Sequence, residues 1–174
     1  MRKVLLALTA ALALATPAQA DVPALWATVN ICDTDTFPDA MGVRASMPGN
    51  GTRQRMYMRF NATFYSRSRQ AWFPVKGNGR SRWIYAGDAK LRARRSGWTF
   101  QFAPPKEGTE FVVRGVVEFQ WRKRRKPRRD GAESRRTARE VVVRRARATT
   151  RHGIRKVGVG DPPGTSEGLC VIKP

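Results

Sequence analysis

Alternating apolar and polar residues dominate this chain and predict strands rather than helices. Between residues 54 and 65 an apolar side chain falls at every second position, and the same period returns at residues 111–122. A shorter alternation of Trp98, Phe100 and Phe102 ends before Pro104-Pro105. No apolar stripe with the 3.6-residue period of an α-helix follows residue 20. The pattern therefore indicates an all-β fold.

The two long strands are expected to bury one face and expose the other. In the first, the core-facing positions are Met56, Met58, Phe60, Ala62 and Phe64, with Tyr57 and Arg59 among those on the other side. In the second, they are Phe111, Val113, Gly115, Val117, Phe119 and Trp121, whereas Arg114, Glu118, Gln120 and Arg122 face water.

Further strands are predicted at residues 25–31, 41–47, 138–149 and 168–173. Residues 71–75 and 82–86 flank Gly77-Asn78-Gly79, which favours a hairpin because glycine and asparagine adopt positive φ cheaply. About eight or nine short strands separated by Gly/Pro turns are typical of an antiparallel β-sandwich.

The strand spacing, the late strand of alternating Phe, Val and Trp, and the final strand resemble secreted bacterial domains of the immunoglobulin or fibronectin type III kind. The resemblance covers most of residues 25–173 and implies an immunoglobulin-like sandwich. The antibody Cys–Trp–Cys core is not reproduced, because Cys32 and Cys170 lie near the chain ends. The resemblance implies architecture and no functional residue.

The first twenty residues have the features of a secretory signal peptide. Arg2 and Lys3 precede an apolar run over residues 4–15, and Ala18-Gln19-Ala20 is a small-x-small cleavage site. This run is too short to span a bilayer, which needs about 20 residues. We therefore expect cleavage after Ala20, a secreted or extracellular location, and a single β-sandwich domain over residues 21–174 with no transmembrane span.

Export changes how the cysteines are interpreted. Two cysteines, Cys32 and Cys170, allow one disulfide in an oxidising compartment. Closing so long a loop contributes about 4–5 kcal/mol in the chain-entropy model. A metal site is disfavoured because neither cysteine has a histidine or another cysteine nearby in the sequence.

Positive charge is concentrated in one part of the chain. The formal net charge is +21, or +19 after the leader is removed, and the cations are 26 Arg and 8 Lys. Residues 122–156 hold 16 of them against three acidic residues. This segment turns at Asp130-Gly131, so we expect a long basic hairpin whose second half pairs back on the strand that begins at Phe111.

This hairpin is the predicted contact for polyanions, because guanidinium groups bind phosphate through a planar fork. The candidate binding residues are Arg122, Lys123, Arg124, Arg125, Lys126, Arg128, Arg129, Arg135 and Arg136. Anionic envelope polymers or lipid headgroups are the expected partners. The alternative is a solvated, solubilising loop whose arginines reflect a GC-rich genome. Specific nucleic-acid readout is not expected, since Arg82-Trp83-Ile84-Tyr85 offers only one stretch where aromatic and basic residues interleave.

Other chemistry has weaker support. Asp33, Asp35 and Asp39 could supply oxygens to calcium, but they lack the glycine and glutamate of an EF-hand, and we expect neither a metal nor a cofactor. His152 is the only histidine and follows a strand. We therefore expect a non-catalytic recognition or envelope-associated module. The alternatives are a secreted hydrolase with paired carboxylates and a purely structural module.

Overall fold

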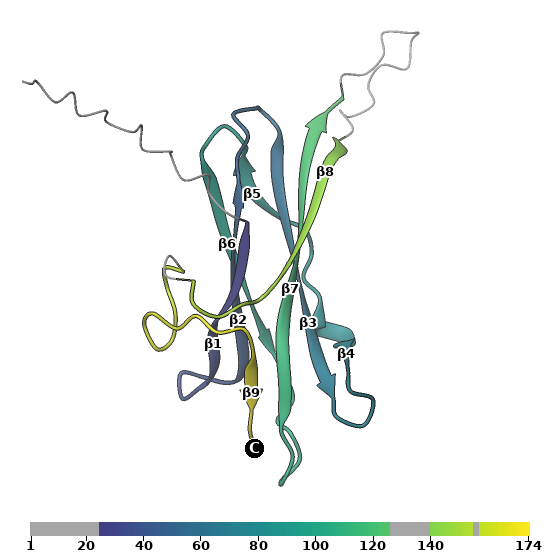
Figure 1. Ribbon diagram of the computed structural model, residues 1–174, viewed down its shortest axis with the longest axis vertical. Helices are drawn as coiled ribbons and strands as arrows, with labels where there is room; N and C mark the ends of the chain where they lie inside the picture. Colours follow the sequence, from purple (N-terminus) through teal and green to yellow (C-terminus); the bar gives the residue numbers. More distant parts are fainter. Residues whose placement is uncertain (1–24, 126–139, 155–156) are drawn as a thin grey trace, which may run out of the picture.

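The computed structural model describes residues 25–125, 140–154 and 157–174. Within these residues nine strands form two antiparallel sheets that face each other as a β-sandwich (Figure 1). The helical content of this part is one 3-10 turn at Gly77–Gly79. The all-β sandwich predicted from the alternation is confirmed.

The first sheet has three strands and the second has six. The first is ordered β1 (Trp26–Thr34), β2 (Phe37–Pro48), β6 (Ala93–Gln101). The central strands of the second are β3 (Arg55–Ser66) and β7 (Phe111–Arg124), which are antiparallel neighbours. The shorter strands around them are β4 (Ala71–Pro74), β5 (Ile84–Asp88), β8 (Glu140–Thr149) and β9 (Cys170–Ile172).

Each edge of the second sheet consists of two short strands placed end to end. β4 and β5 both pair with β3, whereas β9 and β8 both pair with β7. The hairpin predicted around Gly77–Gly79 is therefore wrong, since β4 and β5 do not pair with each other. Val75 N–H donates to Ala62 at 3.0 Å and Ser81 N–H donates to Phe60 at 2.9 Å, so the chain stays beside β3 on both sides of the glycines.

The core lies between the sheets, where the predicted alternation places it. From β3 and β7 it includes Met56, Met58, Phe60, Ala62, Val113, Val117, Phe119 and Trp121. Two predicted core residues are exceptions: Phe64 is 36% exposed and Phe111 is 39% exposed. Both lie near strand ends, at the margin of the sandwich, and Phe64 packs instead on Phe73 with ring centroids 6.0 Å apart.

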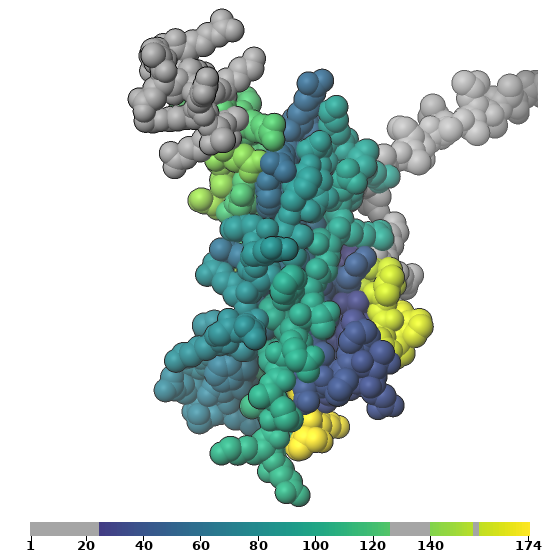
Figure 2. Space-filling view, turned by 180° about the vertical axis from the view of Figure 1, so that it is seen from behind, coloured from purple at the N-terminus to yellow at the C-terminus, as the bar shows by residue number. Residues whose placement is uncertain are grey.

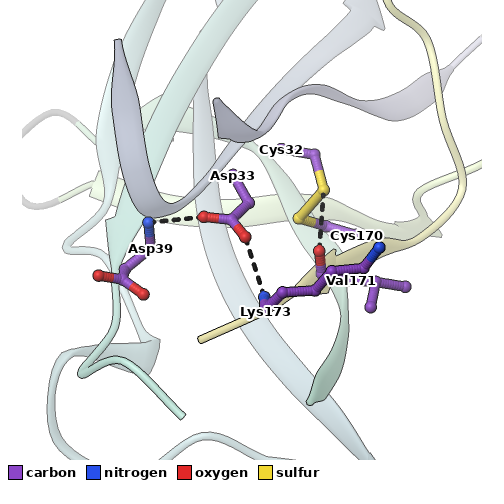
Figure 3. The surroundings of a disulfide bond; sticks show 6 residues. All are labelled: Cys32, Asp33, Asp39, Cys170, Val171 and Lys173. Carbon is purple, nitrogen blue, oxygen red and sulfur yellow. Dashed lines mark hydrogen bonds between the residues drawn. A yellow bond between two sulfur atoms is a disulfide. The ribbon is translucent and has the colours of Figure 1, made fainter. Parts of the chain in front are cut away.

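The predicted disulfide is present and joins the two sheets. Cys32 on β1 and Cys170 on β9 are bonded with their Cα atoms 5.3 Å apart, and Cys170 is buried in the core (Figure 3). Beside it the Asp33 carboxylate accepts hydrogen bonds from the backbone N–H groups of Asp39 at 2.8 Å and Lys173 at 2.9 Å. The disulfide and this carboxylate hold the end of the chain against the β1–β2 turn.

The segment that follows β8 protects the free edge of β1. Val29 and Glu167 exchange two backbone hydrogen bonds of 2.8 and 2.9 Å, and Asp161 N–H donates to Asn30 at 2.8 Å. The buried hydroxyls of Thr28 and Ser166 are 2.9 Å apart. Because these contacts occupy the backbone groups of β1, that edge is not available for pairing with another chain.

We predict that replacing both Cys32 and Cys170 with Ala lowers the free energy of unfolding by about 2–5 kcal/mol, because the unfolded chain gains entropy without the cross-link. Urea unfolding measures the change. The wild type in reductant should match the variant, and the variant should not respond to reductant. A wild-type midpoint that is unchanged by reductant would contradict the staple role.

Candidate functional site

The outer face of the second sheet carries interleaved arginine and aromatic side chains. Alternation along β3 directs Arg55, Tyr57 and Arg59 away from the core, and the register of β7 sets Arg122 and Glu118 beside them. We call this set the arginine–aromatic ladder. Its members are Arg55, Tyr57, Arg59, Trp72, Trp83, Tyr85, Arg114, Glu118, Arg122 and Glu140.

Cation–π contacts connect the ladder across the strands. The guanidinium carbon of Arg59 lies 4.3 Å from the ring centroid of Trp83, and that of Arg122 lies 4.1 Å from Tyr57. Arg55 is 4.3 Å from Tyr85. Such stacking offsets part of the cost of holding a guanidinium in partly desolvated surroundings.

Two carboxylates neutralise the ladder. Glu118 accepts a hydrogen bond from Arg59 Nε at 2.8 Å and lies 4.0 Å from Arg80 Nη2. Glu140 at the start of β8 accepts from Arg55 Nη1 and from the Tyr57 hydroxyl, the latter at 3.2 Å. Its second oxygen is 3.7 Å from Arg122 Nη1. Each carboxylate therefore contacts two arginines.

The electrostatic environment of Glu140 favours its ionised form. Burial alone would raise the pKa of Glu140, but hydrogen bonds from Tyr57 and Arg55 and the charges of Arg55 and Arg122 outweigh it, so the pKa falls below its usual value. Burial raises the pKa of the Tyr57 hydroxyl, and the hydrogen bond to Glu140 raises it further. The carboxylate thus stays charged, and the phenol neutral, at physiological pH.

Arg114 lies in the same ladder but has no such neutralisation. Its guanidinium carbon is 4.0 Å from the ring centroid of Trp72, and among the described residues no carboxylate pairs with it. Desolvation, and then the nearby charge of Arg147, lower the pKa of Arg114. Positive charge without a carboxylate partner among the described residues therefore extends from Arg114 on β7 to Arg147 on β8.

The predicted binding residues fall into three groups. Arg122 belongs to the ladder, and 19% of its side chain is exposed because Tyr57 and Glu140 hold it. Lys123, Arg124 and Arg125 are exposed, and no carboxylate of the described segments forms an ion pair with them. The remaining candidates, Lys126, Arg128, Arg129, Arg135 and Arg136, lie outside the described residues.

β8 carries two exposed arginines, Arg145 and Arg147, that are not among the predicted binding residues. β7 and β8 are antiparallel neighbours, as the predicted hairpin requires, whereas its predicted turn at Asp130-Gly131 lies outside the described residues. Within the pairing, Gln120 lies opposite Arg145, and Glu118 lies opposite Arg147. Both arginines are exposed. Their alternation with Ala146 and Ala148, which pack against the core, is the sequence signal that identifies the outward positions. Arg144 differs, because its guanidinium lies 4.6 Å from the ring centroid of Trp121.

Lys123, Arg124 and Arg125 follow the part of β7 that pairs with β3, and they lie at one end of the molecule. In Figure 1 the end of β7 and the start of β8 reach the extremity opposite β9, and Figure 2 shows the same end from behind, in green. β3 pairs with β7 only up to Arg122, so Lys123 and Arg124 pair with β8 alone. β7 thus has a neighbouring strand on both sides up to Arg122, whereas at Lys123 and Arg124 its only neighbour among the described strands is β8.

The other candidates have structural partners. Trp83 and Tyr85 stack with arginines of the ladder. His152 Nδ1 lies 2.9 Å from Glu167 at an exposed position. Asp33 binds two backbone N–H groups, and no group of three or more His, Cys, Asp or Glu within the described segments could hold a metal ion.

No protein-family model matches this chain, and no curated protein is similar to it in sequence. None of the helices in the described residues is long and apolar enough to cross a membrane.

We predict that Glu140→Gln lowers the free energy of unfolding by about 1.5–3 kcal/mol at neutral pH, the range for hydrogen bonds to a charged group. The pKa of Glu140 is lowered in the folded state, so its stabilisation is complete above the ordinary glutamate value of 4.5 and is lost as the pH falls through the folded-state pKa. Urea unfolding at several pH values should show wild type and variant converging in acid.

Glu110→Gln is the matched control. Glu110 pairs with Arg67, whose side chain is 75% exposed, so its loss should cost less than about 1 kcal/mol. Equal effects of the two substitutions at neutral pH would refute the special role of Glu140.

Proposed function

We propose that this protein is an exported, non-catalytic recognition module that binds phosphate-rich polyanions of the cell envelope through the β7–β8 hairpin. The predicted leader at residues 1–20, which lies outside the described residues, and the Cys32–Cys170 bond support export, since disulfides persist in oxidising compartments. Charge on an exposed hairpin is the chemistry that polyanions recognise.

We further infer that the sandwich is of the immunoglobulin or fibronectin type III kind. The strand order supports this: β1, β2 and β6 form one sheet, and β3, β7 and β8 lie in the other. These groups match the A-B-E and C-F-G strands of immunoglobulin domains. The disulfide differs from the antibody type, because it joins β1 to β9 and not β2 to β7.

One observation carries the proposed binding function: the described part of the protein separates neutralised arginines from unpaired ones. Glu118 and Glu140 engage Arg55, Arg59, Arg80 and Arg122, whereas Lys123, Arg124, Arg125, Arg145 and Arg147 lack a carboxylate partner among the described residues. Like charges that strand pairing brings close together bind a polyanion at a lower ordering cost than the same charges on a free chain.

The carboxylates of this face are less suited to hydrolysis. Glu118 and Glu140 are each held by two arginines, and this environment lowers the pKa of Glu140. A general acid needs a raised pKa to keep its proton at neutral pH. The geometry therefore favours binding over a paired-carboxylate reaction.

We predict that neutralising Lys123, Arg124 and Arg125 with Gln weakens binding to immobilised polyphosphate and reduces its salt dependence. Each lost phosphate contact should lower the slope of log affinity against log salt by about 0.7–0.9. The control removes the same charge from exposed positions in other loops, by Lys76→Gln, Lys106→Gln and Arg151→Gln. Identical elution of the two triple variants would dismiss the hairpin as the contact.

A further inference from the structure

The end of the hairpin combines exposed cations with exposed valines. Val141 is 41% exposed and Val143 is 48% exposed, both on β8. An open hollow at this end is lined by Lys123, Arg124, Arg125, Val141 and Val143. Binding of a soluble polyanion does not explain the exposed valines, because phosphate groups are bound through charge and hydrogen bonds.

The valines are exposed because the hairpin extends beyond the core. Trp121 is the last buried residue of β7, and its indole N–H donates to the Pro48 carbonyl at the end of β2, at 3.2 Å. Lys123 lies two residues further, on the same side of the strand, with Val141 directly opposite. The side of the hairpin that faces the core therefore extends beyond Pro48, the last residue of β2. Beyond that residue the first sheet does not cover the side chain of Val141.

A β-bulge adds the second valine to this side. Trp121 pairs with Arg144 and Arg122 pairs with Val142, so Val143 is the extra residue between these two pairs. Val141 and Val143 then line the same hollow. The result is an apolar patch bordered by three cations.

We propose that this hairpin end docks on an anionic phospholipid bilayer, with Val141 and Val143 in the apolar boundary and Lys123, Arg124 and Arg125 at the headgroups. This rests on the proposed function and assigns the phosphate to a lipid. A bilayer interface offers both chemistries side by side, because apolar side chains there are buried about 5–10 Å into the headgroup/acyl boundary while basic side chains are attracted to anionic lipids. Each basic residue near such a surface contributes about 1 kcal/mol.

The test exchanges the two valines for threonine, which keeps the β-branched shape and strand preference but replaces a methyl with a hydroxyl. The exported, disulfide-bonded protein is used, with its N-terminus established by mass spectrometry so that no uncleaved leader supplies membrane binding. Co-sedimentation with vesicles of phosphatidylglycerol and phosphatidylcholine is compared with vesicles of phosphatidylcholine alone. Soluble polyphosphate is the second probe.

We expect binding to the phosphatidylglycerol vesicles, a loss of about tenfold in the Val141→Thr/Val143→Thr variant, and unchanged polyphosphate affinity. The control, Val159→Thr, changes a valine that is 75% exposed in another segment and should affect neither probe. A gain-of-function variant, Val143→Trp, should bind the vesicles more tightly, because tryptophan prefers the membrane interface.

The two proposals fail separately. Polyphosphate binding with no vesicle binding, or vesicle binding that the threonine variant retains, overturns the bilayer proposal and leaves the proposed function standing. If the wild type binds neither the vesicles nor polyphosphate, the proposed function is wrong as well. If the threonine variant changes the oligomeric state in sedimentation without vesicles, the patch is an interface between copies and the bilayer proposal is wrong.

Discussion

Neutralisation of arginine on the outer face of the second sheet is the interaction on which the rest of this structure depends. A chain with a net charge of +21 must pack its guanidinium groups without self-repulsion, and it has only 13 acidic residues for the purpose. Glu118 and Glu140 each engage two arginines, and the rings of Tyr57, Trp83 and Tyr85 cover the guanidinium faces. These contacts neutralise Arg55, Arg59 and Arg122, whereas five basic residues of β8 and the hairpin end have no carboxylate partner among the described residues: Lys123, Arg124, Arg125, Arg145 and Arg147.

The disulfide and the chain end complement this arrangement at the opposite extremity. Cys32–Cys170 links β1 of the first sheet to β9 of the second, and Asp33 holds the backbone of Lys173 next to it (Figure 3). β9 and β8 share the same side of β7, where β9 pairs with Phe111–Val113 and β8 pairs with Val116–Arg124. The hairpin end thus extends from a sheet that is held at its other end by a covalent bond.

The fold could be predicted further than the site. Period-two alternation located β3 and β7 because both bury one face, and the valines at the start of β8 pair back on β7 as predicted. The predicted turn at Asp130-Gly131 lies outside the described residues. The path of β4 and β5 could not be predicted, since Gly77-Asn78-Gly79 permits a hairpin as readily as a break in one edge. The outward positions of Arg59 and Arg122 were predicted, but their stacking partners depend on the cross-strand register. The sequence therefore predicts Arg122 as a polyanion contact but does not show that Tyr57 and Glu140 contact its guanidinium.

The central claim is that arginines held by carboxylates stabilise the fold, whereas basic residues without a carboxylate partner among the described residues bind polyanions. Arg122 and Arg124 lie two residues apart on β7 and test it most directly, because each loses one charge on substitution with Gln. The unfolding free energy and polyphosphate affinity of both variants should be measured together. The account predicts that Arg122→Gln loses about 1–3 kcal/mol of stability with little change in affinity. Arg124→Gln should show weaker binding at unchanged stability. If Arg122→Gln weakens binding as much as Arg124→Gln and leaves stability intact, the division between structural and binding arginines is wrong.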